Sequence, residues 1–270
     1  MFKYEEDRIP TTLFVAYFGV DLIVFFTAES VWFVAFWMLL GIIPKSCISS
    51  FNHHHQHVAT FRHTLLNRCL ELIYGFQTGV VTNGWTLHHV LGHHLNYRDQ
   101  ERDESRWKRK KGQTMGELEY AVITTLTAYP RGLRVAKRFP QHQLPLLVMS
   151  SITLSMLAFF FYYNWVNALF IFALPMVISL YITAWHTYYH HSGLDSETDF
   201  DASYNITEKW HNILTGNLGY HTAHHIRPAL HWSKLPQFHQ EIESRIPSHL
   251  YRQAPPPFRW ITLLLGRAVR

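Results

Sequence analysis

The chain has 270 residues, of which 48% are apolar and only 16% are charged. Soluble domains carry about 25% charged residues, so this composition favours a membrane protein. The formal net charge is +5, and the 20 histidines are the clearest departure from ordinary composition. The two cysteines, Cys47 and Cys69, exclude a disulfide framework and a metal site built from four thiolates.

Four apolar stretches are candidates for membrane-spanning helices. Three of them, residues 11–28, 144–163 and 165–185, are long enough, or nearly so, to cross a hydrocarbon core of about 30 Å. The second stretch, which begins at residue 31, can span only if its helix continues through Pro44 to about residue 48 or if the bilayer is thinned locally. Glu29 and Ser30 alone separate the first two stretches, and Asn164 alone separates the last two. The sequence therefore predicts an all-α membrane protein with four spans in two helical hairpins.

The positive charges lie on one side of these spans. No lysine or arginine occurs at residues 9–44 or 139–208, so all 24 fall in the N-terminal tail, in the loop 45–138 or after residue 208. With four spans these three regions share one side, which the positive-inside rule assigns to the cytoplasm. We therefore expect a multi-pass membrane protein, in the inner membrane if the cell is bacterial, with both termini and the polar parts cytoplasmic. Buried helices of a soluble all-α protein would not explain the one-sided charge.

Of the 20 histidines, 14 fall in four clusters on this predicted cytoplasmic side, at residues 53–57, 88–94, 186–191 and 221–225. On an α-helix, residues three or four apart share a face, and a doublet adds a ligand about 100° further around. The pairs expected to share a face are His53 with His57, His89 with His93, His186 with His190, and His221 with His224. Neutral imidazole binds iron, copper, zinc and nickel, so the clusters predict a two-metal site near the membrane surface. A single structural zinc would leave half of the histidines unexplained.

The histidine spacing resembles that of the membrane fatty acid desaturase and hydroxylase superfamily. The three boxes read H-x3-H from His53, H-x3-H-H from His89 and H-x2-H-H from His221. The surroundings of the third box, residues 217–239, and the segment 182–195 after the fourth span are also similar to that family. The resemblance covers about residues 10–245.

This resemblance implies one domain, residues 1–270, in which four spans carry a cytosolic helical cap with a di-iron centre. It also implies an oxidoreductase that uses two iron ions, cycling between Fe2+ and Fe3+, with dioxygen as co-substrate. The histidines that match the family's iron ligands are His53, His57, His89, His93, His94, His190, His221, His224 and His225. His186 stands where the family has an asparagine, and it either holds a metal-bound water or binds metal directly.

Three of these ligand assignments leave an alternative open. His54 is spaced from His57 so that it could replace His53, and His88 could replace His89. His191 could be the ligand in place of His190.

Each metal-binding histidine is expected to contact a hydrogen-bond acceptor, because a metal-bound imidazole usually donates its other ring N–H to a carboxylate or carbonyl. The candidate carboxylates are Asp99, Asp103, Glu104, Asp195 and Asp201.

Three further features concern the helices themselves. Asp21 lies inside the first span, where a carboxylate is costly and is expected to bond to a partner within the bundle. Pro175 is expected to kink the fourth helix. Residues 258–270 mix apolar residues with arginines and resemble an amphipathic helix at the membrane interface.

We expect an oxidase that uses dioxygen on a fatty-acyl or related lipid chain, and a fatty acid desaturase is the first hypothesis. The same site could instead hydroxylate a lipid or alkyl chain, or decarboxylate a fatty acid to a terminal alkene. A histidine-rich metal transporter or sensor would line the spans with polar residues, and they hold almost none.

The partners expected from the sequence are a lipid substrate, the bilayer and an electron donor, and no nucleic acid. The chain shows no glycine-rich dinucleotide fingerprint, no ferredoxin-type cysteine spacing and no cytochrome segment. Electrons are therefore expected from a separate ferredoxin, rubredoxin or cytochrome b5-type protein.

Overall fold

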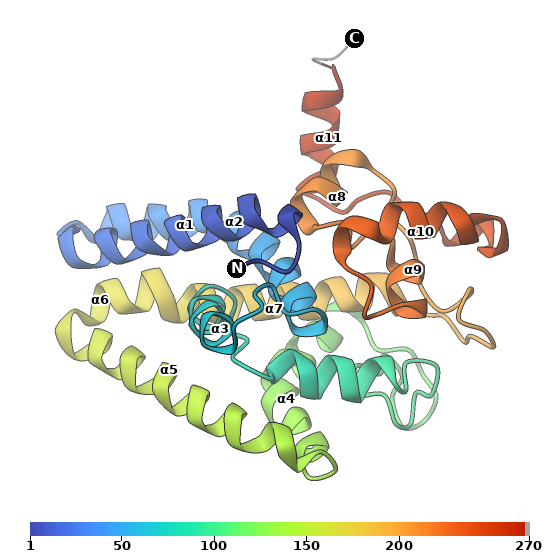
Figure 1. The fold of residues 1–270 in the computed structure, drawn as a ribbon, viewed down its shortest axis with the longest axis horizontal. Coiled ribbons are helices and arrows are strands. Elements are labelled where there is room, and N and C mark those ends of the chain that lie inside the picture. The colour runs from blue at the N-terminus through green and yellow to red at the C-terminus, as the bar shows by residue number, and fades with distance from the viewer. Residues whose placement is uncertain (268–270) are drawn as a thin grey trace.

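The computed structural model describes residues 1–267, and all the regular structure in that range is helical (Figure 1). Four of the described helices are long and apolar enough to cross a membrane. They are Glu5–Thr27, Val31–His57, Pro140–Tyr163 and Trp165–His191. The prediction of an all-α protein with four candidate spans is therefore confirmed.

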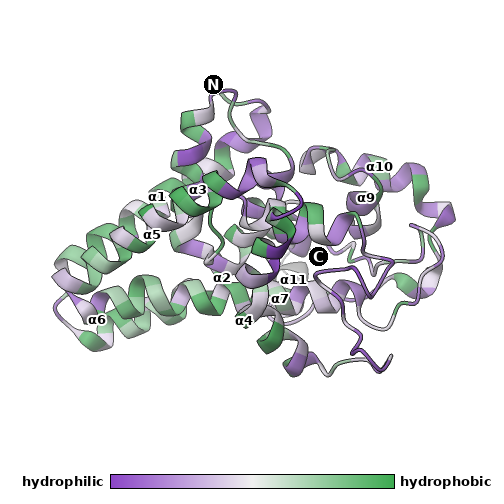
Figure 2. Cartoon of the chain, turned by 90° about the horizontal axis from the view of Figure 1, so that it is seen from below, coloured by the Kyte–Doolittle hydropathy of each residue, from purple (hydrophilic) through white to green (hydrophobic). Residues whose placement is uncertain are grey.

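The spans form two stacked hairpins (Figure 1). The first consists of α1 (Arg8–Thr27) and α2 (Val31–His57), and α2 continues through Pro44 as the short second stretch required. The second consists of α5 (Gln143–Tyr163) and the span that begins at Trp165. Hydrophobic residues gather on these spans, and the rest of the chain is more hydrophilic (Figure 2).

The hairpin turns are fixed by capping side chains. Ser30 accepts a hydrogen bond from the backbone at the start of α2, and Asn164 does the same where the fourth span begins. The Asn167 amide donates to the carbonyls of Phe25 and Ala28, at 2.9 Å each, and so joins the turn of one hairpin to the end of the other. Short polar caps therefore set both the turns and the contact between the hairpins.

The core between the hairpins is aromatic. α3 (Thr64–Thr78) places Phe76 against Phe25, Phe160 and Phe172, and all four rings are buried. Large apolar side chains such as Leu13 on the spans point outward instead, as lipid-facing residues do. α3 thus fills the space between two hairpins that otherwise face lipid.

The fourth span is interrupted near Pro175. It consists of α6 (Trp165–Ala168), a π-helical turn (Leu169–Ala173) and α7 (Leu174–His191). Pro175 has no N–H, so the carbonyl of Ile171, four residues earlier, loses its α-helical donor. Lys45 Nζ donates to that carbonyl at 3.0 Å. The interruption expected at Pro175 therefore takes the form of a π-helical turn with a lysine as substitute donor.

Asp21 has the bundle-facing partners expected of a carboxylate inside a span. Its Oδ2 lies 2.9 Å from Lys45 Nζ, and its Oδ1 accepts a hydrogen bond from Trp37 Nε1 at 2.9 Å. Asp21 and Lys45 are both buried. Through Lys45, this ion pair connects α1, α2 and the fourth span.

The remaining helices form a cap at the ends of the hairpins that lie opposite their turns (Figure 1). The cap consists of η2 (Thr86–His94, a π-helix), α4 (Glu117–Ala136), α8 (Lys209–Thr215), α9 (His221–Ile226) and α10 (Leu235–Ile242). Short 3-10 turns occur at Glu5–Asp7, Pro140–His142, Trp232–Lys234, Glu243–Arg245 and Ser248–Leu250. This arrangement places the histidine-bearing ends of α2 and α7 beneath the cap.

The expected C-terminal helix is present as α11 (Phe258–Arg267), which projects away from the body (Figure 1). Phe258 is buried, whereas Trp260, Leu263 and Leu264 are exposed. The last part of the predicted segment, residues 268–270, lies outside the described residues.

Candidate metal centre

Four elements bring histidines to one place beneath the cap: the end of α2, η2, the end of α7 and α9. Within the described residues, these histidines form two groups whose nitrogen atoms lie within 4.8 Å of one another in each group. The first group is His53, His57, His89, His94 and His224. The second group contains His93, His191 and His225.

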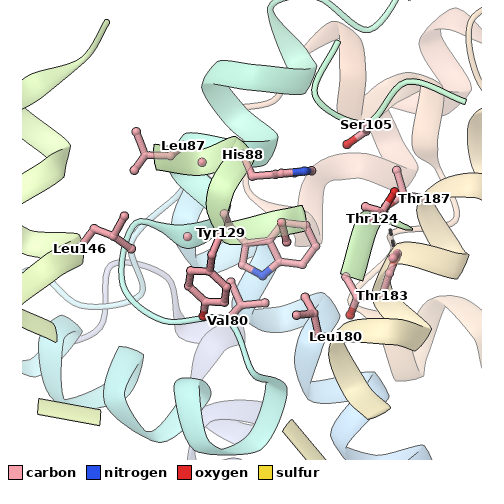
Figure 3. A pocket seen from close by; sticks show the side chains of 15 residues that line it. Val80, Leu87, His88, Ser105, Thr124, Tyr129, Leu146, Leu180, Thr183 and Thr187 are labelled. Carbon is pink, nitrogen blue, oxygen red and sulfur yellow. Dashed lines mark hydrogen bonds between the residues drawn. The ribbon is translucent and has the colours of Figure 1, made fainter. Parts of the chain in front are cut away.

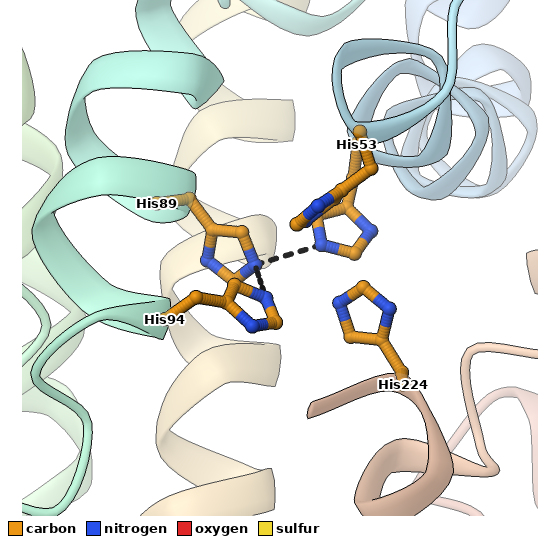
Figure 4. A group of neighbouring side chains, drawn as sticks. His53, His89, His94 and His224 are labelled. Atoms are coloured by element: carbon orange, nitrogen blue, oxygen red, sulfur yellow. Dashed lines mark hydrogen bonds between the residues drawn. The ribbon is translucent and has the colours of Figure 1, made fainter. Parts of the chain in front are cut away.

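The first group surrounds a common point, and the rings of its labelled members face one another in Figure 4. The Nε2 atom of His89 lies 2.8 Å from that of His53 and 2.9 Å from that of His94. Two imidazoles bound at about 2.1 Å and at right angles to one metal would be about 3.0 Å apart. The Nε2 atoms of His57 and His224 are buried and have no hydrogen-bond partner among the described residues. The group therefore fits one shared metal ion.

The second group is extended by a fourth imidazole. The Nε2 atoms of His93 and His191 are 3.2 Å apart. The Nε2 atom of His221 lies 3.0 Å from that of His191 and 3.2 Å from that of His225. We include His221 in the second group on these distances, which gives five imidazoles around one point and four around the other.

Eight of the nine predicted ligands, all except His190, belong to these groups. His190 directs its Nδ1 to the carbonyl of Tyr204, at 2.9 Å, and stacks its ring on His221 with centroids 4.0 Å apart. The open alternative His191 takes its place in the second group, and its Nδ1 lies 3.0 Å from the carbonyl oxygen of Ala202, which orients the ring. His54, His88 and His186 belong to neither group.

Two of the predicted pairs are divided between the two groups. His89 and His93 contribute to different groups, because η2 is a π-helix, whose i→i+5 hydrogen bonds bring residues five apart together. His89 therefore joins His94, and His93 turns to the other group. His221 and His224 are divided in the same way: in α9 the Nε2 atom of His221 lies 3.2 Å from that of His225, four residues on, while His224 joins the first group.

Asp103 is the candidate acid that contacts a site histidine. Its carboxylate lies 2.9 and 3.0 Å from His93 Nδ1, and both side chains are buried. His221 Nδ1 lies 3.3 Å from the carbonyl of Leu218. The remaining candidate acids bond to backbone amides or basic side chains instead, as found for Asp99, Glu104, Asp195 and Asp201.

The electrostatic environment keeps these imidazoles neutral. Burial lowers the pKa of His89, His94 and His224 well below 6.5, and the neighbouring imidazoles lower it further. Metal ions bind the neutral form of imidazole, so the first group can bind a metal ion at neutral pH without first losing protons.

Sequence reasoning missed two side chains near the groups. Tyr97 packs its ring on His225, with centroids 4.4 Å apart, and donates to Asp199 Oδ1 at 2.6 Å. His211 on α8 is buried, and neither ring nitrogen has a hydrogen-bond partner among the described residues. Tyr97 follows the second box by three residues, so its position in the sequence could have indicated that it lies near the site. His211 lies outside the four histidine clusters, and nothing in the sequence indicated its position.

Two cavities adjoin the site. The first lies between α2 and α7, and its wall includes His53, His89 and His221 together with serine and threonine side chains. We call the second the apolar cavity; its walls include Leu87, Tyr129, Leu146 and Leu180 (Figure 3). The two cavities share wall residues Trp85, Thr183 and Thr187. The histidine groups therefore lie beside a cavity that shares part of its wall with a second cavity lined by leucines.

Asp103 gives a direct test of the second group. Replacing Asp103 with alanine is expected to weaken metal binding there by about 10- to 100-fold, because His93 loses the acceptor that orients its ring. Competition with a chelator, followed by metal analysis of the protein, would measure this. Asp195→Ala is the matched control, since Asp195 pairs with Lys108 and touches no site histidine. Equal metal retention in both variants would contradict the role of Asp103.

A family model described as Fatty acid desaturase matches residues 29–257 of the chain. The chain belongs to the fatty acid desaturase family. The resemblance seen in the histidine boxes is therefore confirmed, and membership makes the chain a desaturase-like membrane oxidoreductase of a metal-dependent family. A lipid substrate and a bilayer location fit this family and the four candidate spans. No curated protein and no solved structure matches the chain.

Proposed function

We propose that this desaturase-family protein is a di-iron oxidase that uses dioxygen on a fatty-acyl chain, with fatty acid desaturation as the first candidate reaction. The observation that carries this proposal is the pair of imidazole groups beside two adjoining cavities with largely apolar walls. Nitrogen-rich sites suit iron among other metals. Two bound iron ions would supply the oxidising power that breaking an unactivated C–H bond requires, since no side chain provides it.

The proposed reaction converts –CH2–CH2– to –CH=CH– and consumes one dioxygen, two electrons and two protons, with release of two waters. The protein's own part is to hold the metal ligands and to place the chain. Asp103 orients the ring of the proposed ligand His93. Leu87 and Leu180 contribute an apolar wall for the hydrocarbon tail. Hydroxylation or oxidative decarboxylation on the same scaffold is the second candidate, because placement of the chain to about 1 Å decides the outcome.

A metal transporter receives no support from the spans. The buried charges Asp21 and Lys45 bond to each other and to the carbonyl of Ile171. They therefore tie helices together where a transporter would need polar groups along a path.

We also propose that the chain is one domain with its cap and termini in the cytoplasm, and that a separate electron donor serves it. The one-sided distribution of all 24 lysines and arginines supports the orientation. Reporter fusions at the two ends should both give a cytoplasmic signal, and a periplasmic or lumenal signal from either end would refute this topology.

The function is tested by expression in a bacterial host with a ferredoxin or rubredoxin reductase system, and by mass spectrometry of lipids and volatile hydrocarbons. We expect a new oxidised lipid product and about two iron ions per purified chain. The product should vanish in His224→Ala at equal membrane abundance, because the first group loses a ligand. The matched control is His63→Ala, since His63 is exposed and belongs to neither group. Iron far below two per chain, or unchanged product in His224→Ala, would reject the proposal.

A further inference from the structure

The outer ring nitrogens of the second group, which point away from the other imidazoles, face hydrogen-bond acceptors. His93 Nδ1 lies 2.9 Å from Asp103 Oδ1. His191 Nδ1 lies 3.0 Å from the carbonyl oxygen of Ala202, and His221 Nδ1 lies 3.3 Å from another backbone carbonyl. A neutral imidazole carries its proton on the nitrogen that faces an acceptor. These three rings therefore carry their protons on Nδ1.

With their protons placed outward, the same three rings turn lone pairs toward one another. The Nε2 atom of His191 lies 3.2 Å from that of His93 and 3.0 Å from that of His221. Neither contact is a hydrogen bond between neutral rings, because no Nε2 atom among them carries a proton. All three side chains are buried. The empty second group is therefore a cluster of acceptors that repel one another, and a cation between them would relieve the repulsion.

The first group has the opposite arrangement. The Nδ1 atoms of His53, His89 and His94 are buried and have no hydrogen-bond partner among residues 1–267. The Nε2 atom of His89 lies 2.8 Å from that of His53 and 2.9 Å from that of His94 (Figure 4). These are ordinary hydrogen-bond lengths, so a proton on Nε2 can bridge either contact. The empty first group can therefore satisfy part of its hydrogen bonding by itself.

A metal ion would affect the two groups differently. It takes the Nε2 lone pair, so each bound ring must carry its proton on Nδ1. In the second group that proton already has an acceptor, and His225 is the one ring whose Nδ1 lacks a partner in the described part of the chain. In the first group, His53, His89 and His94 would each present a buried N–H without an acceptor, which opposes binding. The fifth imidazole of the first group favours binding, but three such donors oppose it.

Charge acts in the same direction. Within the described residues, the histidines that contact a carboxylate are His55, His93 and His231. Of these, His93 alone belongs to a histidine group, namely the second. A carboxylate next to a ligand ring attracts the cation and makes the ring a stronger donor to the metal. The second group therefore has an anion in contact with a ligand, whereas the first group has none in this range.

We propose that the two metal positions are unequal: the second group binds its ion about 100-fold more tightly and fills first, and the first group holds the exchangeable ion. The inference rests on the two-metal site of the proposed function. Both groups fill when iron is in excess. When iron is limiting, the chain carries one ion, and His93, His191, His221 and His225 hold it.

Titration of the metal-free protein in detergent with ferrous iron, in the absence of oxygen, tests the order of filling without any turnover. Equilibrium dialysis with metal analysis should give two ions per chain, with dissociation constants about 100-fold apart. His191→Ala should lose the tight phase, and His224→Ala should keep it and lose the weak phase. Equal affinities, or the opposite assignment of the phases, would overturn the proposal while leaving a two-metal site. A single ion per chain in excess iron would reject the two-metal site itself, and this inference with it.

Two variants of Asp103 test the physical cause. Asp103→Asn keeps an oxygen that accepts the proton of His93 but removes the charge, whereas Asp103→Leu removes both. We expect the leucine variant to weaken the tight phase by about 10- to 100-fold and the asparagine variant to recover part of that loss. The weak phase should stay unchanged in both, which also shows that each variant is folded.

Asp195→Ala is the control for these variants, since Asp195 pairs with Lys108 away from the site histidines. It should change neither phase. An unchanged tight phase in Asp103→Leu, beside an unchanged weak phase, would show that the acceptors do not set the difference between the groups and would overturn the proposal.

Discussion

Replacing His191 with alanine is expected to lower the iron content from about two ions per chain to about one and to reduce product formation by more than about 100-fold. His191 places its Nε2 atom 3.2 Å from that of His93 and 3.0 Å from that of His221. Its removal would leave the second group with three imidazoles, two of which lose a close neighbour. Iron analysis of the purified variant, with its absorption spectrum, measures the loss.

His190→Ala is the matched variant, since His190 is the neighbouring residue on the same helix end. Its Nδ1 is engaged with the carbonyl of Tyr204, and it touches the second group only by stacking on His221. We expect it to retain two irons. The opposite pattern, with iron lost in His190→Ala and kept in His191→Ala, would show that α7 presents the other histidine and would reject the grouping described above.

The sequence is sufficient for those parts of the site that depend on local spacing. Hydropathy places the four spans, and the spacing of the boxes identifies eight of the grouped histidines. His53 and His57 act together because α2 is a regular α-helix at its end, where residues four apart share a face.

The sequence is insufficient where the backbone departs from the α-helix. Nothing in the second box distinguishes an α-helix from the π-helix that pairs His89 with His94, so the division of ligands between the two groups could not be predicted. The choice between His190 and His191 depends on the carbonyls of Tyr204 and Ala202, which belong to a loop that folds back on α7. Such long-range backbone contacts leave no periodic signal.

The sequence was also insufficient to predict the ion pair between Asp21 and Lys45. Asp21 is expected from the sequence to need a partner, but Lys45 lies at the predicted membrane boundary, where nothing indicates that it turns inward. The free carbonyl of Ile171, which follows from Pro175, supplies the second reason for Lys45 to be buried. A proline in one span thus determines the position of a lysine in another.

Replacing only one member of the Asp21–Lys45 ion pair is expected to destabilise the protein strongly. Asp21→Leu would leave the Lys45 ammonium buried without its carboxylate, and Lys45→Met would leave the Asp21 carboxylate and the Ile171 carbonyl short of a donor. A buried charge that loses its partner costs about 3–5 kcal/mol. Unfolding of each variant in detergent micelles by increasing sodium dodecyl sulfate would measure the change in the free energy of unfolding.

The double variant Asp21→Leu/Lys45→Met is expected to recover most of that loss, because both desolvated charges are removed together and apolar side chains fill the space. Arg8→Met provides the comparison for an exposed pair, since Arg8 and Glu5 are largely solvated and their separation should change stability little. If the two buried substitutions simply add in the double variant, Asp21 and Lys45 act independently. If the double variant is stable and still holds two irons, the ion pair serves to join α1, α2 and the fourth span, and the metal site needs only that they stay joined.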